Sequence, residues 1–158
     1  MIHKEKMTAT IEGDFVIVLI GMRINQFWKI HKWLPIALSM GRMLKELYSH
    51  PELGFLSHEF GIGRSFIFVQ YWRSMDQLLA YAKNPEAGHL PAWKDFYKRV
   101  GMDGSVGIWH ETYAIPAGSY ETVYTNMPPF GLGKAGKLEK AVGRRDSASG
   151  RLHHENGS

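Results

Sequence analysis

The feature that most constrains this fold is a strand-like segment with large apolar side chains on both faces. Phe66, Phe68, Gln70 and Trp72 alternate with Ile67, Val69, Tyr71 and Arg73. Successive side chains of a strand point to opposite faces of a sheet, so both faces here need cover. Residues 106–113 show the same property. The sheet therefore needs helices on one side and a second apolar surface on the other.

The order of the remaining segments predicts how the sheet is connected. Apolar runs predict strands at residues 14–23, 54–60, 64–73 and 105–115, and a shorter one at 120–126. Helical spacing begins at Trp33 and ends before Pro51, and Ser74 with Gln77 forms a capping box that opens a second helical region. The sequence therefore predicts an α+β fold of the ferredoxin-like βαββαβ type, with an antiparallel sheet.

Composition predicts one folded domain with polar ends. Residues 1–12 are a polar lead-in, residues 13–133 form the domain, and residues 134–158 form a basic tail that we expect to be disordered. The chain has a net charge of +4, and six basic against three acidic residues fall from Lys134 onward. The folded part is therefore nearly neutral, and a nucleic-acid partner is not expected.

Several function classes are excluded by what the sequence lacks. It has no cysteine, which removes disulfides, thiolate zinc sites and a thiol nucleophile. Its longest aliphatic run, residues 15–20, is far shorter than the ~20 residues that cross a bilayer, so we expect a soluble, cytoplasmic protein without a membrane partner. No Gly-rich loop follows a strand and precedes a helix, so flavin or nicotinamide binding is not expected.

Two apolar faces on one sheet also predict how copies assemble. Helices cover one face, and a second copy of the chain would cover the other through an isologous interface. The prediction is a homodimer, a dimeric α+β barrel. The helix-covered side of each subunit would then hold a cavity for a small hydrophobic or aromatic ligand.

Two histidines are the first candidates for chemistry. His89 lies in the second helical region with Trp93 one turn further on the same face, which suits an acid, a base or a ligand in a cavity. A packed or solvent-facing histidine is the alternative. His110 precedes Glu111 on a strand, so the two face opposite sides. If His110 shares a face with Val106, apolar surroundings would keep its imidazole neutral, and a core histidine is again the alternative.

Other candidates would hold the ligand. Arg73 ends a buried strand, where its guanidinium could bind an anionic oxygen, although a surface ion pair is the alternative. Aromatic side chains are numerous, and a subset could form a flat slot for a ring system. We assign substrate binding to Trp72, Trp93, Tyr71, Asn25 and Tyr81.

Five segments together resemble a known family. They are QYWRS (70–74), HLPAW (89–93), GIWHETY (107–113), YETVY (120–124) and NMPPFGLG (126–133). They are similar to a bacterial and fungal monooxygenase-like group named after a protein of a fungal fumagillin-type biosynthetic cluster. The resemblance covers about residues 14–133. The group lies in the dimeric α+β barrel superfamily, with the antibiotic-biosynthesis and the haem-degrading monooxygenases.

The resemblance implies the barrel, the homodimer and oxygen chemistry in secondary metabolism. In the haem-degrading branch a helix histidine ligates iron, helped by an asparagine and a tryptophan. His89 would be that ligand, Asn25 could match the asparagine, and Tyr81 stands in place of the tryptophan. We therefore predict a monooxygenase-like enzyme that requires no cofactor, with His89, His110 and Arg73 as catalytic residues. A haem protein with His89 as axial ligand and a non-catalytic binding dimer remain alternatives, and no other metal site is predicted.

Overall fold

The structure, a computed structural model, describes residues 1–152. Its main body consists of β2 (Phe15–Ile24), α1 (Ile30–Ser49), β3 (Phe55–Ile62), β4 (Ser65–Trp72), α2 (Met75–Lys83), α3 (His89–Arg99) and β5 (Val106–Ile115), with a short 3-10 turn η1 (Pro51–Leu53) before β3. The four strands form one antiparallel sheet in the order β3-β4-β2-β5. This connectivity and strand order confirm the predicted ferredoxin-like α+β fold.

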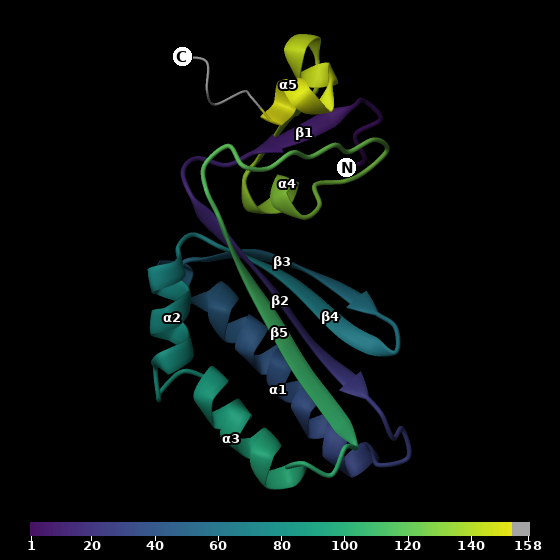
Figure 1. Ribbon diagram of the computed structural model, residues 1–158, viewed down its shortest axis with the longest axis vertical. Helices are drawn as coiled ribbons and strands as arrows, with labels where there is room; N and C mark the ends of the chain where they lie inside the picture. The colour runs from purple at the N-terminus through teal and green to yellow at the C-terminus, as the bar shows by residue number, and fades with distance from the viewer. Residues whose placement is uncertain (153–158) are drawn as a thin grey trace.

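Alternation along the strands divides the core between two faces of the sheet. Val18 and Met22 of β2 pack with residues of the three helices, whereas Phe15 and Ile17 pack on the opposite side. Figure 1 shows α1, α2 and α3 running alongside the sheet. The helix-covered face is therefore one apolar layer, as the pattern of strand residues predicts.

Local sequence signals explain most of the helix ends. The Ser74 hydroxyl oxygen accepts the backbone N–H of Gln77 at 3.2 Å, so the predicted cap of α2 is confirmed. Helix α1 begins at Ile30, three residues before Trp33, and Pro35 therefore lies inside the helix. Of the helices in residues 1–152, none is long and apolar enough to span a bilayer.

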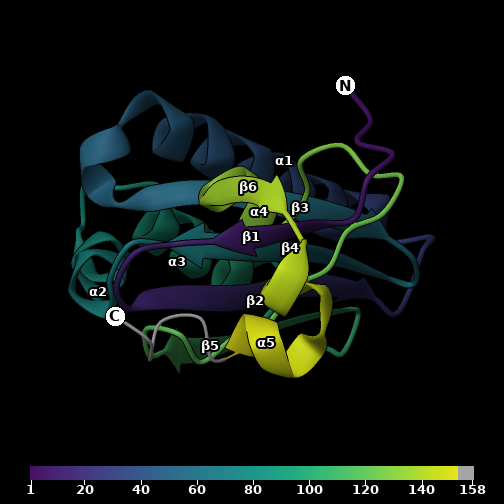
Figure 2. The same cartoon turned by 90° about the horizontal axis from the view of Figure 1, so that it is seen from above.

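The two ends of the chain are structured together, which corrects the predicted polar lead-in and disordered tail for the described residues. Strand β1 (Met7–Thr10) pairs antiparallel with β6 (Lys137–Lys140) in a second, two-stranded sheet. Helix α4 (Leu132–Ala135), the 3-10 turn η2 (Gly143–Asp146) and helix α5 (Ala148–Leu152) complete this terminal module. Figures 1 and 2 show it lying across one end of the main sheet. The rest of the predicted tail, residues 153–158, lies outside the described residues.

The terminal module forms because each end supplies what the other lacks. Ala9 and Ile11 from the lead-in and Leu132, just before the predicted tail, are buried against Phe15 of the main sheet. Neither end contains enough apolar residues to fold by itself, so the composition of each segment does not predict this module. The predicted strand at 120–126 is also wrong, because only Tyr124 makes a bridge, to Met7, within that segment.

Candidate functional site

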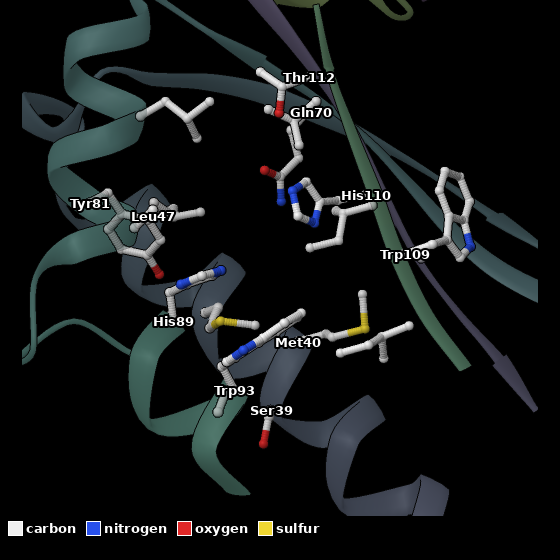
Figure 3. A pocket seen from close by; sticks show the side chains of 18 of the residues that line it. Ser39, Met40, Leu47, Gln70, Tyr81, His89, Trp93, Trp109, His110 and Thr112 are labelled. Atoms are coloured by element: carbon white, nitrogen blue, oxygen red, sulfur yellow. The ribbon is translucent and has the colours of Figure 1, made fainter. Parts of the chain in front are cut away.

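A cavity of about 230 Å3 lies between the helix-covered face of the main sheet and the three helices. The sheet contributes its floor through β2, β4 and β5, and α1, α2 and α3 contribute its walls. Figure 3 shows side chains from these elements converging on it. Within residues 1–152 its lining contains no lysine, arginine, aspartate or glutamate, and its walls are mostly aliphatic and aromatic. Such a site suits an uncharged organic ligand.

His89, the first residue of α3, points into the cavity (Figure 3). Its ring stacks on Trp93 with the centroids 6.3 Å apart at 15° and lies 6.3 Å from the ring of Tyr81. Burial lowers the pKa of His89, partly offset by the carbonyl of Ala82, and the nearby His110 lowers it further. Because the imidazole is held neutral, His89 can accept a proton or ligate a metal.

The buried Nδ1 atom of His89 has no hydrogen-bond partner within residues 1–152. A buried polar atom without a partner is costly in a purely structural position. His89 is packed on Trp93 and Tyr81, as the alternative for this residue predicts, but its Nδ1 atom is left without a partner among the described residues. A group inside the cavity would remove that cost.

His110 lines the same cavity from strand β5 (Figure 3). Its side chain is exposed, because β5 is an edge strand of the sheet. The predicted burial of His110 beside Val106 is therefore wrong, although both lie on one face. Glu111 lies on the other face, where it accepts the hydroxyl of Tyr113 at 2.8 Å. The structure thus brings the two predicted histidines to one cavity, His89 half-buried in the wall and His110 exposed at the rim.

A hydrogen-bonded clamp fixes the helices around His89. Glu46 of α1 accepts both the Tyr81 hydroxyl and the backbone N–H of Gly88 at 3.0 Å each. Burial and the neighbouring Glu46 carboxylate raise the pKa of Tyr81. A Cβ on Gly88 would come within 2.9 Å of Glu46, so the approach requires glycine. Tyr81 therefore lines the cavity, with its hydroxyl already engaged.

Three predicted site residues lie away from the cavity, while Trp72 and Trp93 line it as expected. Arg73 donates to the backbone carbonyls of Glu12 (2.6 Å) and Asp14, which fixes the entry into β2. Its guanidinium is thus used structurally, and the predicted anion-binding position is not formed.

Tyr71 and Asn25 are likewise placed elsewhere. Tyr71 faces the side of the sheet opposite the cavity and packs with Tyr124 and Leu132, where burial raises its pKa to about 12. Asn25 donates to the carbonyl of Gly104 at 3.1 Å and accepts from Arg23 at 2.9 Å. Asn25 therefore joins two loops and does not contact the cavity.

Sequence reasoning missed two polar residues of the cavity floor. Gln70 and Thr112 both pair with Val18 of β2, one from each side, and both line the cavity. The signal was available, because Gln70 interrupts an apolar run on the face that also carries Phe68 and Trp72. A polar side chain at such a position is a candidate for ligand binding.

The antiparallel sheet, with one helix-covered face enclosing an apolar cavity, defines a chain of the ferredoxin-like α+β class. Within this class the chain belongs to the Monooxygenase af470-like family, which it matches over residues 15–132. The resemblance read from the sequence is thus confirmed. No curated protein matches the chain in sequence.

Two solved structures, both aldoxime dehydratases, support the fold. An aldoxime dehydratase, OxdRE, crystallised with butyraldoxime, is 17% identical with a TM-score of 0.65, covering 80% of this chain and 38% of its own. A second aldoxime dehydratase is also 17% identical, with a TM-score of 0.63, covering 80% and 39%. This chain thus spans less than two fifths of those proteins. SnoaB, a cofactor-independent oxygenase from Streptomyces nogalater, is 15% identical with a TM-score of 0.45, covering 63% and 91%.

Proposed function

We propose that this protein is a monooxygenase-like enzyme that oxidises a small, uncharged, hydrophobic or aromatic substrate in the cavity. The observation that carries the proposal is His89, a half-buried neutral imidazole whose buried Nδ1 atom has no partner within residues 1–152, in a mostly apolar cavity. Such a group is a general base for a weakly acidic hydroxyl. Membership in a monooxygenase-like family supports oxygen as the second substrate.

The proposed reaction starts from an aromatic ketone whose enol ionises. His89 takes the enol proton, and the resulting anion transfers one electron to dioxygen. The carbon radical and superoxide combine through a new C–O bond, and the peroxide anion takes the proton back from His89. The hydroperoxide then loses water, its oxygen–oxygen bond breaks, and a carbonyl remains. One CH2 group and one O2 thus give one C=O group and one water, with four electrons passing from carbon to oxygen.

The size and lining of the cavity favour a reaction without flavin or nicotinamide. Its volume of about 230 Å3 lies below the ~300–1,000 Å3 common for sites of drug-sized ligands. Its lining offers no cation to pair with a pyrophosphate. One or two fused rings suit this space, and dioxygen can serve as the oxidant.

Oxygen uptake tests the proposal. The full chain is incubated in air with a panel of naphthols, tetralones and other ketones of one or two fused rings, and the rate is measured with an oxygen electrode. His89→Ala should lower the rate with a turned-over compound about 100-fold or more. His31→Ala, an exposed histidine of α1 outside the cavity lining, is the matched control and should retain full rate. Binding without turnover across the panel would identify a binding protein instead.

A haem protein is a second candidate, favoured by the same neutral ring of His89. His89 by itself suits an axial ligand, since its Nδ1 lacks a partner within residues 1–152. The cavity as a whole does not fit haem, because about 230 Å3 is less than the macrocycle needs and the described lining offers no cation to its propionates. Titration with haemin tests this candidate, because a Soret band that is lost in His89→Ala would select it over the cofactor-free enzyme.

We also propose that the chain is a homodimer through the part of the main sheet left open by the terminal module. On that face Leu19, Ile67 and Val69 are only half-buried, and Tyr113 is 47% exposed. A second copy would cover this strip through a twofold interface. Light scattering should give the mass of a dimer for the full chain and of a monomer for Ile67→Asp. A monomeric wild-type chain at micromolar concentration would contradict the dimer.

A further inference from the structure

We propose that Gln70 is a catalytic residue that stabilises the ionised oxygen of the substrate through its side-chain N–H groups. The inference rests on the proposed function and deepens it, because it names how the anion is held without a cation. It also names the substrate class, a neutral molecule with an acidic hydroxyl that ionises only inside the cavity.

The side-chain amide of Gln70 has a fixed orientation. It projects from the middle of β4 into the cavity (Figure 3). Its Oε1 accepts the indole N–H of Trp72 at 3.1 Å. Because an indole N–H only donates, the atom facing it must be the amide oxygen, so the amide orientation is chemically fixed.

Trp72, which contacts the Gln70 amide, is held rigidly by its neighbours. Its side chain is 1% exposed, the largest fully buried side chain in the described part of the chain. It packs edge-on to Phe55 with the ring centroids 5.4 Å apart and also contacts the ring of Tyr81. Trp72 is therefore a positioning residue that holds the Gln70 oxygen and directs the NH2 group elsewhere.

The NH2 group of Gln70 remains available to donate a hydrogen bond to a ligand. Within residues 1–152 its Nε2 makes no hydrogen bond. The competing hydroxyls of the cavity walls are used, since Ser39 donates to the carbonyl of Pro35 and Tyr81 donates to Glu46. Gln70 therefore presents a preoriented donor to the cavity, the arrangement that stabilises developing negative charge.

The absence of cations from the lining sets the substrate class. A carboxylate or phosphate would enter already charged and lose its hydration without a counter-charge, which is strongly unfavourable. A phenol or enol enters neutral and becomes an anion only when His89 takes its proton. The negative oxygen can then accept from Gln70, and the protonated imidazole remains nearby as its counter-charge.

The test uses 4-nitrophenol, whose phenolate absorbs in the visible range, so that binding and ionisation are read without turnover. The ratio of phenolate to phenol affinity is measured by titrating the full chain across pH. In Gln70→Leu this ratio should fall about tenfold or more, because one hydrogen bond to a charged oxygen is lost. In Gln70→Glu the fall should be larger, because the carboxylate repels the anion. Trp72→Phe should give an intermediate loss.

4-Nitroanisole, which cannot ionise, is the matched ligand, and its affinity should change less in each of these variants than the affinity for the phenolate does. A phenolate preference that is unchanged in Gln70→Leu would overturn the inference, and so would failure of the wild-type chain to bind 4-nitrophenol. Absence of oxygen uptake alongside a Gln70-dependent phenolate preference would refute the proposed oxidation and leave the anion-binding role of Gln70 standing.

Discussion

The two faces of the main sheet differ in how their polar groups are used. On the face toward the terminal module, the Tyr120 hydroxyl binds the backbone of Ile11, Thr122 accepts the N–H of Ala9, and the Tyr124 hydroxyl accepts the N–H of Gly133. On the face toward the helices, His89 Nδ1 and Gln70 Nε2 have no partner within residues 1–152. Both faces hold a buried polar atom without a partner within residues 1–152, since Ser57 Oγ lies beside Tyr71 on the module side. Only on the helix side do such groups line the cavity, where they can act on a ligand.

This difference separates stability from chemistry within a single set of strands. Satisfied polar groups and tight packing stabilise the fold, whereas unpartnered groups beside a cavity are costly until a ligand arrives. We therefore expect substitutions on the module side to lower stability without specific effects on ligands. Substitutions on the cavity side should change ligand binding and have smaller effects on stability.

Removal of the tail should give the largest effect on stability. A chain that ends at Phe130 loses Leu132 and β6 and exposes Ala9 and Ile11, which they help to bury. Each fully buried aliphatic side chain contributes about 1.5–3 kcal/mol. The free energy of unfolding, measured by urea denaturation, should therefore fall by about 4 kcal/mol or more. A chain that ends at Leu152 keeps every described element and is the control. Equal stability of the two chains would restore the interpretation of residues 134–152 as a disordered tail.

A pair of aromatic substitutions compares the two faces directly. Phe15 is 1% exposed on the module side, and Phe15→Ala should lower the unfolding free energy by about 3–5 kcal/mol. Trp93 is 36% exposed beside the cavity, and Trp93→Ala should have a smaller effect on stability. Trp93→Ala should weaken binding of 4-nitroanisole, because one wall of the cavity is lost. Equal loss of stability in the two variants would mean that the cavity side is packed as tightly as the module side.

Alanine substitutions at two glycines should change the free energy of unfolding in opposite directions, by smaller amounts. A Cβ on Gly21 would come within 2.6 Å of the Phe66 carbonyl oxygen and of the Trp109 indole nitrogen, so Gly21→Ala should destabilise by about 1–3 kcal/mol. Gly41 lies inside α1 with open space around its Cβ position. Gly41→Ala should stabilise by up to about 1 kcal/mol, because alanine favours helix. Thermal denaturation measures both, and a destabilised Gly41→Ala would show that the helix surface is covered there.

The main sheet was predictable because its signals are local. Apolar alternation and the Ser74 cap located each strand and helix within a few residues. The terminal module was not predictable in this way, because β1 and β6 are separated by most of the chain and neither is strongly apolar. Their pairing depends on tertiary contacts with Phe15, which no sequence window contains.

The candidate site was predicted in part for a similar reason. Helical spacing correctly placed His89 and Trp93 together, since both lie on one turn of α3. Tyr71 was assigned to the same slot as Trp72, although adjacent strand residues face opposite sides. The position of Arg73 depended on how the chain leaves β4, which periodicity does not specify.

The smallest effect concerns pH and the state of His89. Burial lowers the pKa of His89 in the folded protein below the value of about 6.5 expected in the unfolded chain. As the pH falls below that value, the unfolded chain takes up a proton before the folded protein does. The free energy of unfolding should therefore fall as the pH is lowered from 7 toward 5. His58, whose pKa burial also lowers, contributes in the same direction.

His89→Asn should reduce this acid destabilisation, while the contribution of His58 remains. The measurement is urea denaturation at pH 7 and pH 5 for both proteins, with the exposed His31→Asn as the control. If the free energy of unfolding falls between pH 7 and pH 5 by the same amount in His89→Asn as in the wild type, burial does not hold this ring neutral. The cavity side would then lack the neutral base that distinguishes it from the module side of the sheet.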